Sequence, residues 1–301
     1  MAFYENDRKM LDDIGLNQAH FTQLFTDSAK QFITDHQDDS FFLYVAHKDP
    51  HQPFFPSAQF RGKSKGGSYG DAVEEFDHSV GEVLDLLDSL DLTENTIVVV
   101  TSDNGPWFEG NPCGLRGRKG QLFEGGYRVP FIIRYPNKFK QAYKTDIPAM
   151  GIDLLPTLIA EAGVSLPKDR IIDGENLFEL LSDSTGFAKT RPLFFFHDYA
   201  FEAVRMGDWK FLETNYSYTW PIPLEHPNYV TKEFVSKYSP SESDTAINRL
   251  DNWPKLYNLK ESPHESYNLN SRYVAKSKEM QSVLSDFRND YLNNPRGWID
   301  K

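Results

Sequence analysis

The chain has 301 residues, of which 39% are hydrophobic and 14% aromatic, enough apolar material for a large folded domain with or without a smaller one. A formal net charge of −12 argues against nucleic acid as the main partner, and no apolar run approaches the roughly 20 residues that cross a bilayer. A single cysteine, Cys113, excludes an internal disulfide framework. The first residues lack the basic-then-apolar pattern of a signal peptide, and the compartment is not predicted.

The first hundred residues show alternating helix and strand patterns. Residues 1–16 are polar and without pattern, whereas residues 21–33 carry apolar side chains at helical spacing. The run Phe-Phe-Leu-Tyr-Val-Ala at 41–46 predicts a buried strand. A continuous apolar stripe over 69–90 predicts a long helix, and the β-branched run at 97–101 predicts a second buried strand. This order is typical of a parallel sheet covered by helices.

The second strand is followed by a turn and a long loop. Asp103-Asn104-Gly-Pro cannot continue a strand, and the glycine-rich residues 107–128 are long enough to be a functional loop. Residues 129–135 predict a further strand and residues 153–163 a helix, with Asp153 near the N-cap.

The pattern changes near residue 185, where short strands and tight turns replace the longer elements. Residues 213–250 are polar and rich in proline. The predicted elements are strands at 193–196, 203–206, 209–212 and 255–258 and a closing helix at 274–292. We therefore expect an α/β fold with a largely parallel central sheet flanked by helices over residues 1–185, and a small antiparallel α+β subdomain over residues 186–301.

Three polar stretches follow predicted parallel strands, and ligands of such sheets bind beyond the carboxyl ends of the strands. They are residues 47–51, the pair Asp103-Asn104, and residues 116–119. Two oxygen ligands without cysteine favour Ca²⁺ or Mg²⁺ over zinc. A histidine and a lysine beside such a cation suit a phosphate-like or sulfate-like ester. The residues alone therefore predict metal-assisted chemistry on an oxyanion ester.

The motifs themselves resemble those of the formylglycine-dependent sulfatases of the alkaline phosphatase superfamily. The similarity runs in consistent order from about residue 20 to residue 270. It is carried by five stretches: Phe41-Phe-Leu-Tyr-Val-Ala-His-Lys-Asp-Pro-His51, Tyr69-Gly-Asp-Ala-Val-Glu-Glu-Phe-Asp77, Asn95-Thr-Ile-Val-Val-Val-Thr-Ser-Asp-Asn-Gly-Pro106, Gly114-Leu-Arg-Gly-Arg-Lys-Gly120 with Glu124-Gly-Gly-Tyr-Arg-Val-Pro130, and Leu256-Tyr-Asn-Leu-Lys-Glu-Ser-Pro-His-Glu-Ser-Tyr-Asn-Leu269.

This resemblance implies a role for four residues in the hydrolysis of a sulfate ester carried by a small molecule or a sulfated glycan. Asp103 and Asn104 would be ligands of a divalent cation, usually calcium. Lys119 would contact a sulfate oxygen, and His51 would help to protonate the leaving alcohol. The alternatives are a simple turn for the Asp-Asn pair, a solvated charge for the lysine and a turn cap for the histidine. For His47, Arg116 and Arg118, a supporting role in the site and a purely structural role are both open.

The nucleophile motif of the family is missing. Sulfatases form formylglycine from Cys-x-Pro-x-Arg or Ser-x-Pro-x-Arg, whereas Cys113 is followed by Gly-Leu-Arg. The strand that carries two further aspartate ligands is missing as well. We therefore expect the chain to correspond to the C-terminal two-thirds of a typical sulfatase domain, with little turnover by itself. Two other possibilities are a phosphate-ester hydrolase of the same superfamily and a non-catalytic truncated paralogue. The alcohol and the oligomeric state are not predicted.

Overall fold

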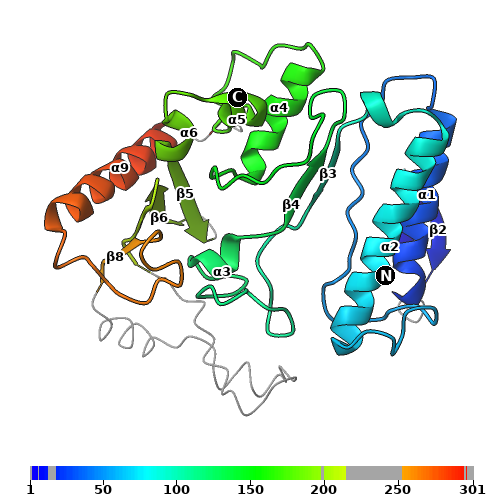
Figure 1. Cartoon of the computed structure of the whole chain (residues 1–301), viewed down its shortest axis with the longest axis horizontal. Helices are drawn as coiled ribbons and strands as arrows, with labels where there is room; N and C mark the ends of the chain where they lie inside the picture. The colour runs from blue at the N-terminus through cyan, green and yellow to red at the C-terminus, as the bar shows by residue number, and fades with distance from the viewer. Residues whose placement is uncertain are drawn as a thin grey trace. The chain divides into compact units, whose positions relative to one another are not determined.

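A computed structural model describes residues 2–5, 7–12, 18–197, 200–214, 253–294 and 296 (Figure 1). The chain divides into two compact units. The first contains residues 1–100 and 132–142, and the second contains residues 101–131 and 143–301. Most of the polar stretch at 213–250 lies outside the described residues. No helix in the described ranges has the length and apolar character needed to span a membrane. The predicted boundary at residue 185 stays a prediction.

The first unit begins with an antiparallel hairpin that the polarity pattern did not predict. Strand β1 (Ala2–Glu5) pairs with β2 (Arg8–Asp12), and Glu5 lies opposite Arg8. Only two residues connect the strands, which is the commonest hairpin connection. The aromatic pair Phe3-Tyr4 supplies strand propensity that a polar composition hides.

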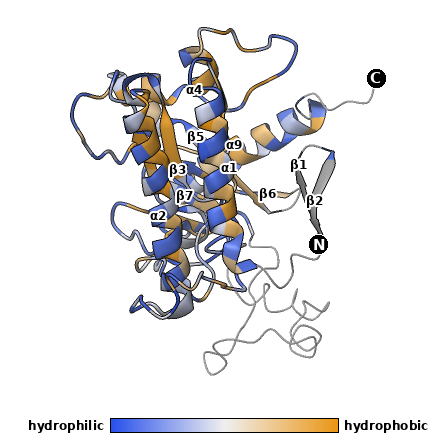
Figure 2. Cartoon of the chain, turned by 90° about the vertical axis from the view of Figure 1, so that its right-hand side faces the viewer, coloured by the Kyte–Doolittle hydropathy of each residue, from blue (hydrophilic) through white to orange (hydrophobic). Residues whose placement is uncertain are grey.

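Two helices form the body of the first unit, as predicted. After the 3₁₀ turn η2 (Gln18–His20), α1 (Phe21–Asp35) packs against α2 (Gly67–Ser89). A hydrogen bond of 2.6 Å joins the hydroxyl groups of Thr26 and Ser79, and Lys30 Nζ lies 2.6 Å from Glu82. Both helices carry hydrophilic and hydrophobic residues, as amphipathic helices do (Figure 2).

The prediction of a buried strand at residues 41–46 is wrong. These residues form no strand, and their backbone makes no hydrogen bond to another described residue. The side chains alternate as on a strand, and Phe42 and Tyr44 are 75% and 80% exposed. A strand exists only beside a neighbour that accepts its backbone hydrogen bonds, so the apolar run alone does not create one.

A short sheet follows the 3₁₀ turn η3 (Thr93–Asn95). Strands β3 (Val98–Thr101) and β4 (Phe131–Arg134) pair in a two-stranded sheet. Both strands were predicted, but β3 is half-buried to exposed and not enclosed on both faces. The largely parallel central sheet therefore stays a prediction.

The second unit contains the predicted antiparallel sheet. Strands β5, β6, β7 and β8 lie in that order and pair antiparallel, and helix α9 packs on β6 and β7 (Figure 1). The bounds are β5 Pro192–His197, β6 Ala200–Met206, β7 Trp209–Leu212, β8 Lys255–Asn258 and α9 Val274–Asn293. Short elements precede the sheet: α3 Glu124–Tyr127, η4 Gly151–Asp153, α4 Leu154–Glu161, α5 Leu177–Ser182 and α6 Phe187–Thr190.

The two faces of this sheet pack against different parts of the second unit. On one face Val204, Phe211 and Leu256 pack with two buried residues of α9, Met280 and Leu284. On the other face Ala203, Leu212 and Tyr257 pack against Leu122 and Phe123, which lie in the loop before α3. The alternation follows from the two-residue period of a strand. The sheet therefore supports the loop that carries Lys119.

Asp153 begins α4, as expected, but its side chain does not cap that helix. The carboxylate is fully buried and forms an ion pair with Arg191 at 2.5 Å. It also accepts hydrogen bonds from the backbone N–H groups of Met150 and Glu175. These contacts tie α4 to the start of the sheet.

Candidate functional site

The turn after β3 and the loop that carries Lys119 are joined through their backbones. The N–H of Lys119 donates to the carbonyl of Pro106 at 3.1 Å, and Gly105 donates to Gly126 at 2.8 Å. Asp103 is exposed, and Asn104 and Lys119 are half-buried. The structure therefore brings together, in the second unit, three of the four residues that the sequence singled out.

Glycines make this close approach possible. A Cβ atom on Gly105 would lie 2.0 Å from the carbonyl oxygen of Gly125. A Cβ atom on Gly126 would lie 2.1 Å from the carbonyl oxygen of Gln121. Because both obstacles are backbone atoms, no side-chain rotation relieves the clash. The spacing between the Asp-Asn turn and the lysine loop therefore requires residues without side chains.

Arg116 and Arg118 hold the loop in shape from two sides. One nitrogen of Arg116 donates to the carbonyl of Glu265 at 3.0 Å, and its guanidinium lies 4.1 Å from the ring centroid of Phe123. One nitrogen of Arg118 donates to the carbonyls of Trp107 and Gly110 at 2.6 and 2.9 Å. Both arginines thus have structural partners, whereas the Lys119 ammonium has none among the described residues.

A buried charge network, which we call the Lys210 network, fastens α3 to the sheet. Lys210 Nζ lies 2.9 Å from Glu124 and 3.3 Å from Glu265, and all three side chains are buried. Arg205 adds a contact of 3.0 Å to Glu124. Arg205 and Lys210 point to this face because they share the strand parity of Ala203 and Leu212.

The network shifts the pKa of both carboxyl groups. Burial alone would raise the pKa of Glu124, but the positive charges of Lys210 and Arg205 outweigh it and lower that pKa. Burial raises the pKa of Glu265, and Lys210 opposes the rise only in part. Glu124, which faces both Lys210 and Arg205, is therefore compensated more fully than Glu265. Sequence reasoning missed this network, although a lysine inside the run Trp-Lys-Phe-Leu was a signal for a buried partner.

His51, the fourth predicted residue, belongs to the first unit. Its side chain is exposed, and its Nδ1 lies 2.6 Å from the carbonyl of Gln52. His47 is more enclosed: Nε2 lies 3.3 Å from the hydroxyl of Ser79, and the buried Nδ1 has no hydrogen-bond partner among the residues that the structure describes. Burial lowers the pKa of His47, and the nearby carboxylate of Asp49 opposes this shift. The role predicted for His51 stays a prediction.

The described residues offer a hard cation only part of a coordination sphere. Asp103 and Asn104 present oxygen atoms, which suit Ca²⁺ or Mg²⁺. In the described ranges no three His, Cys, Asp or Glu side chains gather closely enough to hold a metal ion. The chemistry of this pair fits a hard cation, while the number of ligands falls below the six to eight that Ca²⁺ takes.

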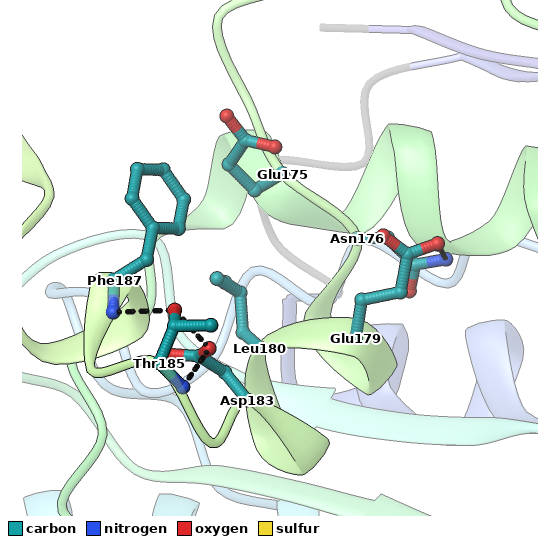
Figure 3. A pocket seen from close by; sticks show the side chains of 7 residues that line it. All are labelled: Glu175, Asn176, Glu179, Leu180, Asp183, Thr185 and Phe187. Atoms are coloured by element: carbon teal, nitrogen blue, oxygen red, sulfur yellow. Dashed lines mark hydrogen bonds between the residues drawn. The ribbon is translucent and has the colours of Figure 1, made fainter.

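A hollow of about 300 Å³, which we call the acidic hollow, lies beside α5 and α6 and carries three acidic side chains (Figure 3). They are Glu175, Glu179 and Asp183. The hydroxyl of Thr185 and the N–H of Ala188 donate to Asp183, and these bonds lower its pKa to about 2. That carboxylate therefore closes the turn between the two helices.

Comparison with known proteins now identifies the class. A family model described as "Sulfatase" matches residues 2–164, more than half of the chain, and one described as "N-sulphoglucosamine sulphohydrolase, C-terminal" matches residues 118–218. The chain belongs to the sulfatase family, in agreement with the motifs.

Several curated proteins that are similar to this chain are named sulfatases. Human steryl-sulfatase is 39% identical over 62% of this chain and 34% of its own length. N-acetylgalactosamine-6-O-sulfatase of Bacteroides thetaiotaomicron is 31% identical over 88% of this chain and 50% of its own length, and mouse N-acetylgalactosamine-6-sulfatase is 34% identical over 89% and 51%. The chain thus spans between a third and a half of these relatives.

Solved structures of sulfatases also align with this chain. A sulfatase from work on glycosaminoglycan metabolism by Bacteroides thetaiotaomicron aligns with a TM-score of 0.74 and 29% identity, over 90% of this chain and 55% of that one. A sulfatase from Pseudoalteromonas aligns with a TM-score of 0.78 over 98% and 58%, at 20% identity. The fold is that of the sulfatases.

Proposed function

We propose that this chain supplies part of the active site of an enzyme that hydrolyses a sulfate ester to an alcohol and inorganic sulfate. Membership of the sulfatase family supports the reaction class. The observation that carries the assignment to this site is the hydrogen bond of 3.1 Å from the N–H of Lys119 to the carbonyl of Pro106. It holds next to the Asp103-Asn104 turn a lysine that has no ionic partner in the described part of the chain.

Each residue then has a defined task. Asp103 and Asn104 are two of the oxygen ligands of a divalent cation, Ca²⁺ in the first place and Mg²⁺ as the alternative. The ammonium of Lys119 contacts a sulfate oxygen and stabilises the negative charge that develops during cleavage. His51 donates a proton to the leaving alcohol oxygen. A bound cation would add positive charge beside the same sulfate group.

The attacking group is the missing part. The 301 residues contain no Cys-x-Pro-x-Arg or Ser-x-Pro-x-Arg from which formylglycine could form. We therefore expect little turnover from this polypeptide by itself. As substrate we favour a sulfated glycan over a sulfated small molecule, because the relatives that match 88% and 89% of the chain are named for N-acetylgalactosamine 6-sulfate.

Binding to the purified chain tests these roles separately from turnover. Calorimetry with calcium should show weak binding, no tighter than about 10⁻⁴ M, because two ligands complete little of the coordination sphere. Asp103→Asn should abolish this binding, whereas Asp146→Asn, at an exposed aspartate, should leave it unchanged. Submicromolar calcium affinity would contradict the incomplete site.

Sulfate binding tests the lysine. Lys119→Ala should weaken the binding of inorganic sulfate at least tenfold, and Lys168→Ala, at an exposed lysine of the same unit, should not. Equal sulfate binding by wild type and Lys119→Ala would exclude the proposed contact. Aryl sulfate hydrolysis well above background that disappears in Lys119→Ala would overturn the expectation of little turnover.

Two competing functions have their own signatures. Tighter binding of phosphate than of sulfate through Lys119 would favour phosphate-ester hydrolysis. The reading frame upstream of Met1 separates an active sulfatase from a non-catalytic paralogue, since only the former should encode the formylglycine motif in frame.

A further inference from the structure

A hollow of about 270 Å³ lies beside Lys119, and aromatic side chains form part of its wall. We call it the Trp107 hollow; its walls include Trp107, Phe108, Leu115, Arg118 and Lys119. All of these residues lie in the second unit. Two cationic and two aromatic residues therefore line one open space.

The two rings are held in place without being part of the core. Trp107 and Phe108 lie edge to face with their centroids 4.8 Å apart, and both are half-exposed. Neither ring belongs to the buried clusters of the described residues. Arg118 fixes the backbone of Trp107 at 2.6 Å and lies 5.1 Å from the centroid of Phe108. Because their planes are 84° apart, the two rings form a preorganised corner next to the lysine.

The chemistry of this surface selects a ligand class. A lysine attracts an anionic group, and an aromatic face packs against the apolar face of a ring. The volume lies just below the range of about 300–1,000 Å³ that is usual for drug-sized ligands, so it suits one ring better than a fused ring system.

We infer that the Trp107 hollow binds the alcohol part of the substrate as a single sugar ring, stacked on Trp107 with its edge against Phe108, and with its sulfate group on Lys119. This inference rests on the proposed function, because it takes Lys119 as the sulfate contact. It adds Trp107 and Phe108 as the residues that determine the selectivity for the alcohol part of the substrate.

Calorimetry with three ligands tests the inference on the whole chain. The ligands are N-acetylgalactosamine 6-sulfate, estrone sulfate as a fused-ring sulfate, and inorganic sulfate. The sugar sulfate should bind about tenfold more tightly than inorganic sulfate and more tightly than estrone sulfate. Trp107→Ala should remove that tenfold gain while leaving the binding of inorganic sulfate intact, and Trp107→Phe should retain most of the gain. Phe187→Ala removes an exposed aromatic ring from the acidic hollow in Figure 3 and should change nothing.

The outcomes separate the two proposals. If Trp107→Ala and Phe108→Ala bind the sugar sulfate as tightly as wild type, the sugar site is wrong, while dependence on Lys119 leaves the proposed function standing. If Lys119→Ala does not weaken sulfate binding, both proposals fail. Tighter binding of estrone sulfate through Trp107 would overturn the choice of a sugar.

A measurement on the wild-type chain covers the case in which Trp107→Ala does not fold. Saturation of aromatic protons should transfer magnetisation to the sugar ring protons of N-acetylgalactosamine 6-sulfate, and inorganic sulfate should compete the signal away. Absence of this transfer at saturating ligand would overturn the inference.

Discussion

The side-chain carboxylate of Glu265 accepts a hydrogen bond of 2.7 Å from the backbone N–H of Glu124, a residue 141 positions earlier in the chain. The carbonyl of Glu265 accepts a second bond from Arg116 at 3.0 Å. Glu265 adopts a φ of 50°, a conformation that few residues other than glycine use. Glu265, in the C-terminal part of the chain, thus binds Arg116 and Glu124, which lie on either side of Lys119 in the sequence.

Removing the ammonium of the Lys210 network should destabilise the second unit. Lys210→Met leaves Glu124 and Glu265 buried without their shared partner, and we expect a loss of about 3–5 kcal/mol in the free energy of unfolding. Urea denaturation followed by circular dichroism measures this loss. Lys276→Ala, which breaks an exposed pair with Glu279, should cost less than about 1 kcal/mol. Equal effects of the two variants would contradict a structural role for the network.

Adding one carbon atom at Gly105 should disrupt the site. In Gly105→Ala the new Cβ meets the backbone of Gly125, so we expect a loss of about 3 kcal/mol and weaker sulfate binding. Gly81→Ala is the matched control, because a Cβ there meets nothing within 4 Å and the residue lies inside α2. That change should stabilise the protein by about 0.5–1 kcal/mol. Thermal unfolding of both variants provides the comparison, and a harmless Gly105→Ala would refute the close backbone packing.

The stability of the first unit should depend on pH through His47. Because burial lowers the pKa of this imidazole, the folded state binds its proton less tightly than the unfolded state. Stability is therefore complete above the ordinary pKa of 6.5 and decreases as the pH falls from there towards the lowered value. His47→Phe should make the free energy of unfolding less dependent on pH between 7 and 5. Titration of the imidazole by NMR is the direct measurement, and a pKa at or above 6.5 would contradict the prediction.

The exposed apolar residues of segment 41–46 should limit solubility. Phe42 and Tyr44 are 75% and 80% exposed on an extended segment whose backbone has no described partner, which is an aggregation-prone combination. The double variant Phe42→Lys with Tyr44→Lys should raise the concentration at which the chain stays monomeric, with little change in unfolding free energy. Light scattering checks this. Leu292→Lys, at an equally exposed apolar residue of α9, should help less because it lies on a regular helix.

Local patterns were sufficient for the elements that stabilise themselves through a nearby partner. The helical spacing at 21–33 and 69–90 matches α1 and α2 closely, because each buries its apolar stripe against the other. Strands β5, β6 and β7 were equally visible, since each pairs with the next or the preceding strand in the chain. The residues at 41–46 have the same apolar character, but their strand needs a partner from elsewhere.

The residues proposed for the site come from local motifs, whereas contacts between distant residues were found only in the structure. Asp103, Asn104 and Lys119 follow from local sequence, and their backbone tie was found only in the structure. The contact between Glu124 and Glu265 spans 141 positions, and no local pattern encodes such a pairing. Cys113, whose lack of a following proline set it apart from the nucleophile motif, is exposed.

The hydrogen bonds from Arg116 and Glu124 to Glu265 also determine when the Lys119 loop can fold during synthesis. Residues 116–124 leave the ribosome long before residue 265 exists, so this loop cannot take its final form until the C-terminal sheet has been made. Helices α1 and α2, which complete their packing within the first 89 residues, face no such delay. The part of the chain that binds sulfate in our proposal is therefore among the last to mature, and premature termination before residue 265 would leave it unformed.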